Sequence, residues 1–398
     1  MKNKNTIHRR DFLKISTLIG AGTLLSPATI AASLNRRLSP EDQPQPIPRR
    51  ALGKTGARLP ILSMGVMRAD NPNLLRAAYN AGIYHFDTAH GYQNGRNEEM
   101  IGNFFQDKPR DSFFIASKIK SNYPLRDNFE QDLNEKLDVS LKRLKMPYLD
   151  ILYMHAFASV NEVNDPRIIA AMQKIKEEGK TRFIGFSTHA HKPEMIDAAA
   201  RQGLYDVILV SYNFKLHNAA ETTRAIQQAA NAGIGIIAMK TMTGGREDPQ
   251  GQRKINARAC LRWAWENESI ATAIPGFTNF DELDECLAAA QAPALTTDDQ
   301  HYLADLQHRE MLFCQRCESC VATCPKHLPI PDIMRAYMYA HGYKQASLSR
   351  ETLMDLDINA APCSGCTACT VKCPSGFDVQ RKIAAIAPVL NVPAEFLS

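Results

Sequence analysis

Short apolar runs alternate with amphipathic segments of helix length from residue 61 to residue 290, and this alternation constrains the fold more than any other feature. The strand-length runs are 61–66, 85–89, 113–118, 150–155, 183–187, 207–212, 234–240 and 271–275. The helical patterns include 74–81, 129–144, 168–178, 193–202, 222–232 and 280–290. Strands joined by helices pair in parallel through right-handed crossovers, and eight such units predict an α/β fold of the (β/α)8 TIM barrel type. An open doubly wound sheet is the competitor, but residues 64–68 (Met-Gly-Val-Met-Arg) lack its Gly-rich turn.

Polar residues end most of the predicted strands. These strand-end residues are Asp87, Lys118, His155, Ser187, Tyr212 and Lys240, and Tyr92 follows in the loop after the second strand. The C-terminal ends of the strands form the active-site face of a parallel barrel. A single strand-end Lys or His would be an ordinary solvated residue, but the joint pattern predicts a site at this rim.

The residue types at this rim suit proton transfer to an oxygen atom. Lys118 beside Asp87 would keep its proton and its positive charge. The phenol of Tyr92 has an ordinary pKa of about 10, and a nearby cation is expected to lower it toward the neutral range. His155 could bind and orient a carbonyl oxygen. Together the four residues predict protonation of an oxygen while hydride arrives at the adjoining carbon.

Residues 86–92 (Phe-Asp-Thr-Ala-His-Gly-Tyr), residues 98–102 (Glu-Glu-Met-Ile-Gly), Lys118 and His155 resemble the aldo-keto reductase superfamily. The resemblance spans about residues 49–290, and it matches all four members of the family's Asp-Tyr-Lys-His tetrad in order. It implies a (β/α)8 barrel, NAD(P)H bound in extended form, and Tyr92 as the general acid. It also implies cofactor contacts at Ser187, Tyr212 (stacking on the nicotinamide), Lys240, Met242, Gly276 and Thr278.

The chain departs from the usual cofactor contacts of that family. Thr188 stands where Asn is usual, Leu209 where Gln is usual, and Thr278 where many members carry a cation for the 2′-phosphate. Glu282 and Cys286 replace Gln and Asn near the adenosine end. Loss of a cationic clamp weakens phosphate recognition, and Glu282 would repel a phosphate. The sequence therefore leaves open whether the barrel binds NADP, NAD or neither.

Two cysteine runs of identical spacing follow the barrel. They are Cys314-x-x-Cys317-x-x-Cys320-x-x-x-Cys324-Pro and Cys363-x-x-Cys366-x-x-Cys369-x-x-x-Cys373-Pro. In two-cluster ferredoxins the fourth cysteine of such a run ligates the other cluster. The predicted ligand sets for two [4Fe-4S] clusters are therefore Cys314, Cys317, Cys320 with Cys373, and Cys363, Cys366, Cys369 with Cys324. Zinc sites use two separated Cys pairs, and Cys-x-x-Cys disulfides are tight and reducible, so both alternatives are weaker. Helical patterns at 331–338 and 350–356 predict a small α-helical ferredoxin-like iron-sulfur domain.

The first 33 residues have the composition of an export signal. Arg9 and Arg10 precede an uncharged stretch at 15–35 that ends in small residues, which resembles a twin-arginine (Tat) signal. An uncleaved membrane anchor is the alternative, although Gly and Pro residues within the stretch weaken it. The formal net charge is +5, and most of it lies in the first fourteen residues, so a nucleic-acid partner is not expected.

Three parts are therefore expected: a Tat signal at 1–33, an aldo-keto reductase barrel at 46–300, and a ferredoxin-type domain at 301–398. Export of a folded, cluster-loaded protein through the Tat translocase would bring it to the periplasm. The expected function is an oxidoreductase that reduces a carbonyl or quinone-like small molecule, with the clusters relaying electrons from a redox partner protein. One alternative is a non-catalytic electron-transfer or docking protein with a degenerate nicotinamide site. Another is metal-assisted chemistry at His90, His155, His189 and His191.

Overall fold

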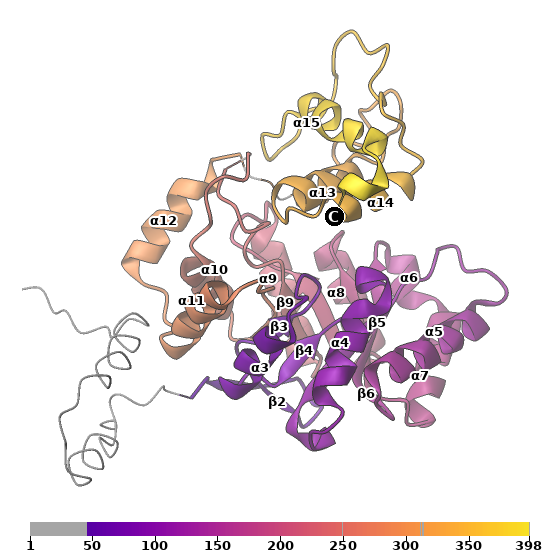
Figure 1. The fold of residues 1–398 in the computed structure, drawn as a ribbon, viewed down its shortest axis with the longest axis vertical. Coiled ribbons are helices and arrows are strands. Elements are labelled where there is room, and N and C mark those ends of the chain that lie inside the picture. The colour runs from indigo at the N-terminus through magenta and orange to yellow at the C-terminus, as the bar shows by residue number, and fades with distance from the viewer. Residues whose placement is uncertain (1–45, 249, 311, 313, 398) are drawn as a thin grey trace, which may run out of the picture. The chain divides into compact units, whose positions relative to one another are not determined.

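A computed structural model describes residues 46–397 except 249, 311 and 313, so the predicted export signal lies outside the described residues. Eight strands form one parallel sheet in sequence order (Figure 1). They are β3 (Met64–Gly65), β4 (His85–Asp87), β5 (Phe114–Ile119), β6 (Leu149–Phe157), β7 (Thr181–Thr188), β8 (Val207–Ser211), β9 (Gly235–Met239) and β10 (Ile270–Ala273). The first and last strands meet through a parallel bridge between Leu62 and Ala273, and the Ser63 amide donates to the Ala273 carbonyl oxygen at 2.9 Å. The predicted (β/α)8 barrel is confirmed.

Helices follow each strand and cover the outside of the barrel (Figure 1). They are α3 (Pro72–Asn80), α4 (Arg96–Phe105), α5 (Phe129–Leu144), α6 (Val160–Asn164), α7 (Pro166–Glu177), α8 (Lys192–Gln202), α9 (Ala219–Asn231), α10 (Ala257–Trp265) and α11 (Phe280–Gln291). Local sequence sets their ends. The Asp165 side chain accepts a hydrogen bond from the Arg167 amide at the start of α7, where Pro166 is the first helical residue. Gly203 ends α8 with a φ of 70°, a left-handed conformation that favours glycine.

Alternate residues of the strands fill the inside of the barrel and the layer beneath the helices. Phe114, Ile151, Leu209 and other inward-facing side chains form the interior cluster. A hairpin of β1 (Arg49–Ala51) and β2 (Arg58–Pro60) adds Leu52 and Leu59 to this cluster. The hairpin thus packs against the interior core, while the polar strand ends described below lie on the opposite rim.

The C-terminal part of the chain is helical. Helix α12 (Thr297–Gln307) packs its Leu303 and Leu306 against Cys260 of α10, and the expected domain boundary between residues 300 and 301 falls inside it. Helices α13 (Ile330–His341), α14 (Ala346–Met354) and α15 (Val379–Ile386) enclose a separate apolar cluster that includes Ile333 and Leu353. The described residues after β10 contain no strand, as the predicted helical ferredoxin-type module requires. No described helix combines the length and the apolar character needed to cross a bilayer.

The iron-sulfur module contacts the barrel along α13 and the loop that precedes it. The Gln315 side chain donates to the Lys215 carbonyl oxygen and accepts from the His217 amide at 2.5 Å. Gly251, in the loop after β9, lies directly against the backbone carbonyl of His341, so a Cβ atom there would collide with α13. Its φ of 70° also favours glycine. These contacts fix α13 over the C-terminal ends of the barrel strands.

Candidate active site

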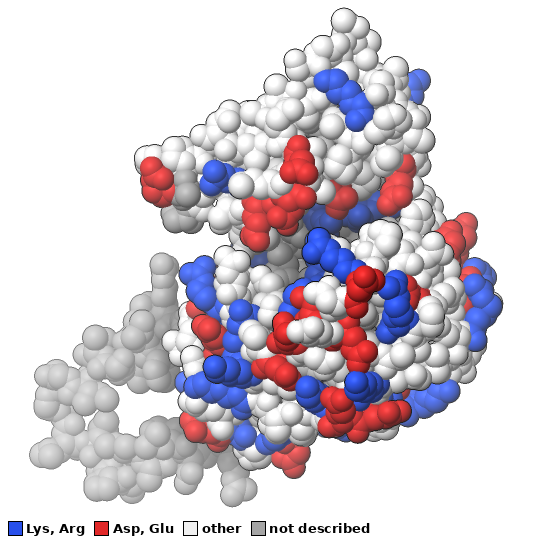
Figure 2. All heavy atoms as spheres, turned by 90° about the vertical axis from the view of Figure 1, so that its right-hand side faces the viewer, with Lys and Arg blue, Asp and Glu red and all other residues white. Residues whose placement is uncertain are grey.

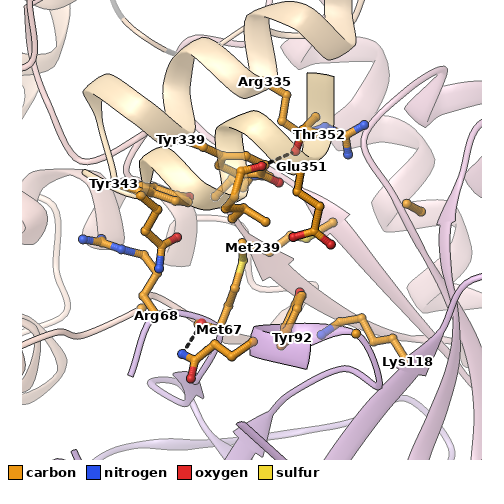
Figure 3. A pocket seen from close by; sticks show the side chains of 18 of the residues that line it. Met67, Arg68, Tyr92, Lys118, Met239, Arg335, Tyr339, Tyr343, Glu351 and Thr352 are labelled. Atoms are coloured by element: carbon orange, nitrogen blue, oxygen red, sulfur yellow. Dashed lines mark hydrogen bonds between the residues drawn. The ribbon is translucent and has the colours of Figure 1, made fainter. Parts of the chain in front are cut away.

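A cavity of about 1210 Å³ lies at the C-terminal ends of the strands. Residues at the ends of β4, β5, β6, β7 and β9 form its floor, and residues of α13 and α14 form its roof (Figure 3). The four predicted tetrad residues, Asp87, Tyr92, Lys118 and His155, all line it. The structure therefore brings together in space the four side chains that the sequence placed at separate strand ends.

Asp87 and Lys118 form a buried ion pair at the cavity floor. Asp87 ends β4 and is paired in register with Ala116, which puts Lys118 on the same face of the neighbouring strand β5. The Lys118 ammonium donates to an Asp87 carboxylate oxygen and to the Thr88 carbonyl oxygen at 2.6 Å. The two side chains are only 1% and 3% exposed. Burial raises the pKa of Asp87 and lowers the pKa of Lys118, and their mutual attraction opposes both shifts.

Tyr92 begins a short 3-10 helix, η2 (Tyr92–Gly95), directly after β4. The Lys118 ammonium lies 4.9 Å from the centre of its ring. Burial raises the pKa of Tyr92 well above 10, and Asp87, Tyr339 and Tyr343 raise it further. The prediction that Lys118 lowers this pKa is therefore wrong, because Asp87 offsets the lysine's charge and burial disfavours the phenolate. The phenol keeps its proton throughout the ordinary pH range.

His155 faces Tyr92 across the cavity floor. The two rings meet edge to face, with centroids 5.8 Å apart and planes at 81°. The pairing of β6 with β7 is irregular between Met154 and Phe157, and the Ser187 hydroxyl accepts a hydrogen bond from the Ala156 amide at 2.8 Å. Such bulges often re-aim a side chain next to an active site. Burial and the nearby cations, Lys118 first among them, hold the pKa of His155 well below 6.5, so its imidazole is neutral.

The expected nicotinamide contacts separate into two groups. Ser187, Lys240, Met242 and Gly276 line the cavity. Tyr212 does not, because its ring packs on Trp263 at 4.9 Å and its hydroxyl is paired with that of Thr223 at 2.8 Å. Thr278 is also elsewhere: its amide and hydroxyl donate to the Glu282 carboxylate at 2.8 and 2.9 Å. The expected stacking of Tyr212 on a nicotinamide is thus not available in this structure, and four of the six expected contacts line the cavity.

Strand alternation explains the position of Tyr212. Val207 and Leu209 of β8 point into the barrel interior, whereas Ile208 and Val210 belong to the layer beneath the helices. Tyr212 is two residues beyond Val210 and therefore falls on the helix side. This inward-outward pattern was visible in the sequence and could have corrected the expectation.

The roof of the cavity supplies residues that the sequence analysis missed. Arg335 and Tyr339 lie four residues apart on α13, and Tyr343 follows the helix, so all three project to one side. Figure 3 shows Tyr339 and Tyr343 above the floor that carries Tyr92 and Lys118. The guanidinium of Arg68 lies 4.6 Å from the Tyr343 ring and links roof to rim. The spacing on α13 was a usable signal, but nothing in the sequence indicated that α13 covers the barrel.

The two cysteine runs lie next to each other in the module. Cys373 acts electrostatically on Cys314 and Cys320, and Cys324 acts on Cys363. These proximities fit the crossed ligand sets of a two-cluster ferredoxin. Hydrogen bonds join the runs directly, because the Thr370 hydroxyl donates to the Thr323 carbonyl oxygen at 2.8 Å. None of the ten cysteines forms a disulfide, and Cys260 and Cys286 are buried in the helix packing as expected.

The eight cysteines suit iron-sulfur clusters better than a single metal ion. Among the described residues, no three His, Cys, Asp or Glu side chains form a group that could hold one ion. A mononuclear site needs ligands that converge on one point, whereas each iron of a [4Fe-4S] cube binds its own cysteine. The alternative histidine site is also not assembled. His90 pairs with Ser140 at 3.0 Å and His191 with Glu318 at 3.2 Å, and the described histidines form no metal-binding group.

Comparisons with known proteins agree with this architecture. The aldo/keto reductase family model matches residues 56–258, just over half of the chain, and a 4Fe-4S dicluster domain model matches residues 313–378. The chain is 26% identical over 298 residues to L-galactose dehydrogenase of Arabidopsis thaliana, covering 65% of this chain and 92% of that protein. It is 22% identical over 332 residues to the aldo-keto reductase AFTS1 of Alternaria alternata, covering 64% of this chain and 90% of that protein.

Among solved structures, the holo form of an aldo-keto reductase from Bacillus halodurans superposes with a TM-score of 0.55 at 21% identity. The match covers 66% of this chain and all of that one, and it shows that the two share a fold. The curated relatives named as dehydrogenases or reductases agree with an oxidoreductase. With its closed barrel and the family model matched across it, this chain belongs to the aldo/keto reductase family and carries a 4Fe-4S dicluster domain at its C-terminus.

Proposed function

We propose that this chain is an exported iron-sulfur oxidoreductase that reduces a carbonyl or quinone-like group of a small molecule in the cavity between barrel and module. One observation carries the proposal. Tyr92, His155 and the Asp87–Lys118 pair face a cavity whose roof belongs to the same module as the eight cluster-type cysteines. The same cavity is therefore bordered by proton-donating side chains and by the module that carries the cluster-type cysteines.

The floor of the cavity supplies the proton chemistry. When a carbonyl is reduced, negative charge develops on its oxygen, and the neutral imidazole of His155 can donate a hydrogen bond to that oxygen. Tyr92 retains its proton because its pKa is raised, and an alkoxide oxygen is basic enough to take it. Lys118, held by Asp87, keeps a positive charge 4.9 Å from the ring on which the phenolate would form. General acid catalysis of this kind contributes roughly 10²–10⁴-fold to a rate.

Conversion of a carbonyl to an alcohol takes two electrons and two protons. Tyr92 supplies the proton on oxygen, solvent water supplies the proton that forms the new C–H bond, and the electrons must come from elsewhere. Iron-sulfur clusters supply electrons one at a time when they are bound. Arg316, between Cys314 and Cys317, lines the cavity, whereas Cys369 of the second run is exposed. The proposal accordingly assigns the set containing Cys314 to the side of the substrate and the set containing Cys369 to a redox partner protein at the surface.

An anaerobic assay tests this function. The purified holoprotein should contain about eight iron and eight sulfide per chain, and with reduced methyl viologen as donor it should reduce methyl benzoylformate, a neutral α-keto ester. Acid release of bound nucleotide, read by absorbance, would show whether a nicotinamide co-purifies. Iron near zero, or carbonyl reduction that persists unchanged in Tyr92→Phe, would contradict the proposal.

The non-catalytic alternative has one observation in its favour. Tyr212 and Thr278, expected at the cofactor, are engaged with other residues of the barrel. A docking or electron-transfer protein would accept electrons from reduced methyl viologen and pass them to a partner, yet would reduce no carbonyl under any donor. Reoxidation by carbonyl compounds in the assay above therefore separates the two functions.

Export is proposed from the sequence alone. Arg9 and Arg10 stand where a twin-arginine signal requires them, and clusters are assembled before such a folded protein crosses the membrane. Residues 1–45 fused to a reporter should direct it to the periplasm. Replacement of both arginines by lysine should keep the reporter in the cytoplasm, and export of the Lys-Lys variant at the original level would contradict a twin-arginine route.

A further inference from the structure

The cavity contains more basic than acidic groups where the roof meets the barrel. Arg316 and Arg335 share a single carboxylate, that of Asp332, with the Arg316 guanidinium 2.6 Å from it. Lys240 lies beside them and also lines the cavity. Three cations thus face one anion at this end. Figure 2 shows Lys and Arg side chains deep in the hollow between barrel and module, with Asp and Glu side chains along the lower edge of the module.

Lys240 has no anionic partner of its own. It follows β9 with a φ of 55°, a left-handed conformation uncommon for lysine, which turns the chain at the cavity wall. No described carboxylate forms an ion pair with its ammonium, and the rings of Tyr339 and Tyr343 each lie 5.9 Å from it. Burial, followed by the repulsion of Arg335 and Arg316, lowers the pKa of Lys240 to about 7. A half-buried ammonium without an ion-pair partner is placed to bind an anionic ligand from the cavity.

Two further groups at this end are also unsatisfied. The Nδ1 atom of His189 and the Nε atom of Arg335 are buried and have no hydrogen-bond partner among the described residues. Lys240, Arg335 and His189 all line the cavity, as does His155 of the tetrad. Burial first, and then Lys240 and Arg335, lowers the pKa of His189.

We propose that the substrate is an anion, and that Lys240, Arg335 and His189 bind its carboxylate while its carbonyl oxygen meets Tyr92 and His155. This inference rests on the proposed function and names its substrate class, the small oxo acids. A carboxylate can accept hydrogen bonds from all three groups at once and would neutralise the excess charge. The module would then determine specificity, because Arg335 belongs to α13.

Acidic residues of α14 also line the cavity and would orient such a substrate. Glu351 of α14 points down toward Tyr92 and Lys118 (Figure 3), and Asp355 lies one helical turn further on. A carboxylate there would be repelled. The anionic end of the substrate is therefore expected under α13, with the remainder of the molecule extending below α14.

A cofactor phosphate is the competing source of negative charge at Lys240. Thr278, expected near a 2′-phosphate, does not line the cavity and donates to the Glu282 carboxylate. Lys240, Arg335 and His189 instead line the same cavity as the tetrad residue His155. The geometry therefore favours a compact anion that carries both the carboxylate and the reacting carbonyl.

Binding of a matched pair of probes tests the proposal. Benzoylformate carries a carboxylate next to its ketone, and methyl benzoylformate has the same ketone without the charge. Isothermal titration of the oxidised, full-length holoprotein should show benzoylformate binding at one site, at least about tenfold tighter than the ester. Lys240→Met and Arg335→Gln should each weaken benzoylformate by about tenfold or more and leave the ester unchanged. Lys254→Met, which removes an exposed lysine of the same loop outside this cavity, is the control and should change neither affinity.

The outcomes separate this proposal from the function on which it rests. Equal affinities for the two probes, or an affinity for benzoylformate that neither variant alters, would overturn the anion site even if the ester is reduced. Tight binding of NADP⁺ that is lost in Lys240→Met, without benzoylformate binding, would assign the lysine to a cofactor phosphate and also overturn it. If benzoylformate binds more tightly than the ester but the reduced holoprotein reduces neither compound, the anion site is supported and the proposed reaction is contradicted.

Discussion

Replacement of Tyr92 by Phe removes one hydroxyl from the cavity floor and little else. The ring keeps its edge-to-face contact with His155 at 5.8 Å and its position 4.9 Å from the Lys118 ammonium. The hydroxyl has no hydrogen-bond partner among the described residues, so its loss leaves no buried group unpaired and should cost about 1 kcal/mol of stability or less. If Tyr92 delivers the proton, kcat should fall by roughly 10²–10⁴, a barrier increase of about 3–5 kcal/mol. The Michaelis constant should change by no more than about fivefold, the worth of one neutral hydrogen bond.

Anaerobic steady-state reduction of methyl benzoylformate, with reduced methyl viologen as donor, measures both constants. Tyr343→Phe is the matched control, because it removes a phenol from the roof of the same cavity while the ring can stay beneath Arg68. The control should retain kcat within about threefold. A Tyr92→Phe enzyme as fast as Tyr343→Phe would refute the argument that the phenol is the acid.

Three other perturbations follow from the same geometry. Lys118→Met leaves Asp87 buried without its cation, so the free energy of unfolding should fall by about 3–5 kcal/mol. The thermal midpoint of the Lys118→Met variant should fall below that of the wild type. The double variant with Asp87→Asn should recover part of the lost stability. Cys373→Ser should remove one cluster and lower iron from about eight to about four per chain, whereas loss of both clusters or of neither would contradict Cys373 as a ligand of a single cluster. The pKa of Lys240, lowered to about 7 in the free protein, should rise when an anion binds. Benzoylformate affinity should therefore be constant below about pH 7 and fall above it, with proton uptake near pH 8 in calorimetry; a flat profile would contradict a role for the lysine's charge.

The sequence predicted the barrel and the position of the tetrad because both depend on local patterns. Strand and helix periods are visible residue by residue, and parallel strands must bring their C-terminal ends to one rim. Asp87, Lys118 and His155 each end a run that the structure confirms as a strand or its edge. These three residues meet in one cavity because the parallel strands that carry them end at the same rim.

The remaining features depend on tertiary packing that no local pattern encodes. The pKa of Tyr92 was predicted in the wrong direction because burial and Asp87 outweigh Lys118, and burial here depends on a distant helix. Tyr212, whose ring packs on Trp263, is the exception, because strand alternation alone places it on the helix side. Arg335 and Tyr339 belong to a module whose docking over the barrel depends on contacts such as Gly251 against α13, which sequence periodicity does not reveal.

The central claim is that the cavity and the clusters form one redox unit, and rapid mixing tests it most directly. Holoprotein reduced with dithionite, freed of excess reductant and mixed anaerobically with benzoylformate should recover the visible absorbance of oxidised clusters. One hydroxy acid should form for every two electrons lost, in the absence of any nicotinamide, and Tyr92→Phe should slow both events together. Clusters that stay reduced while product forms only on addition of NADPH would contradict the account.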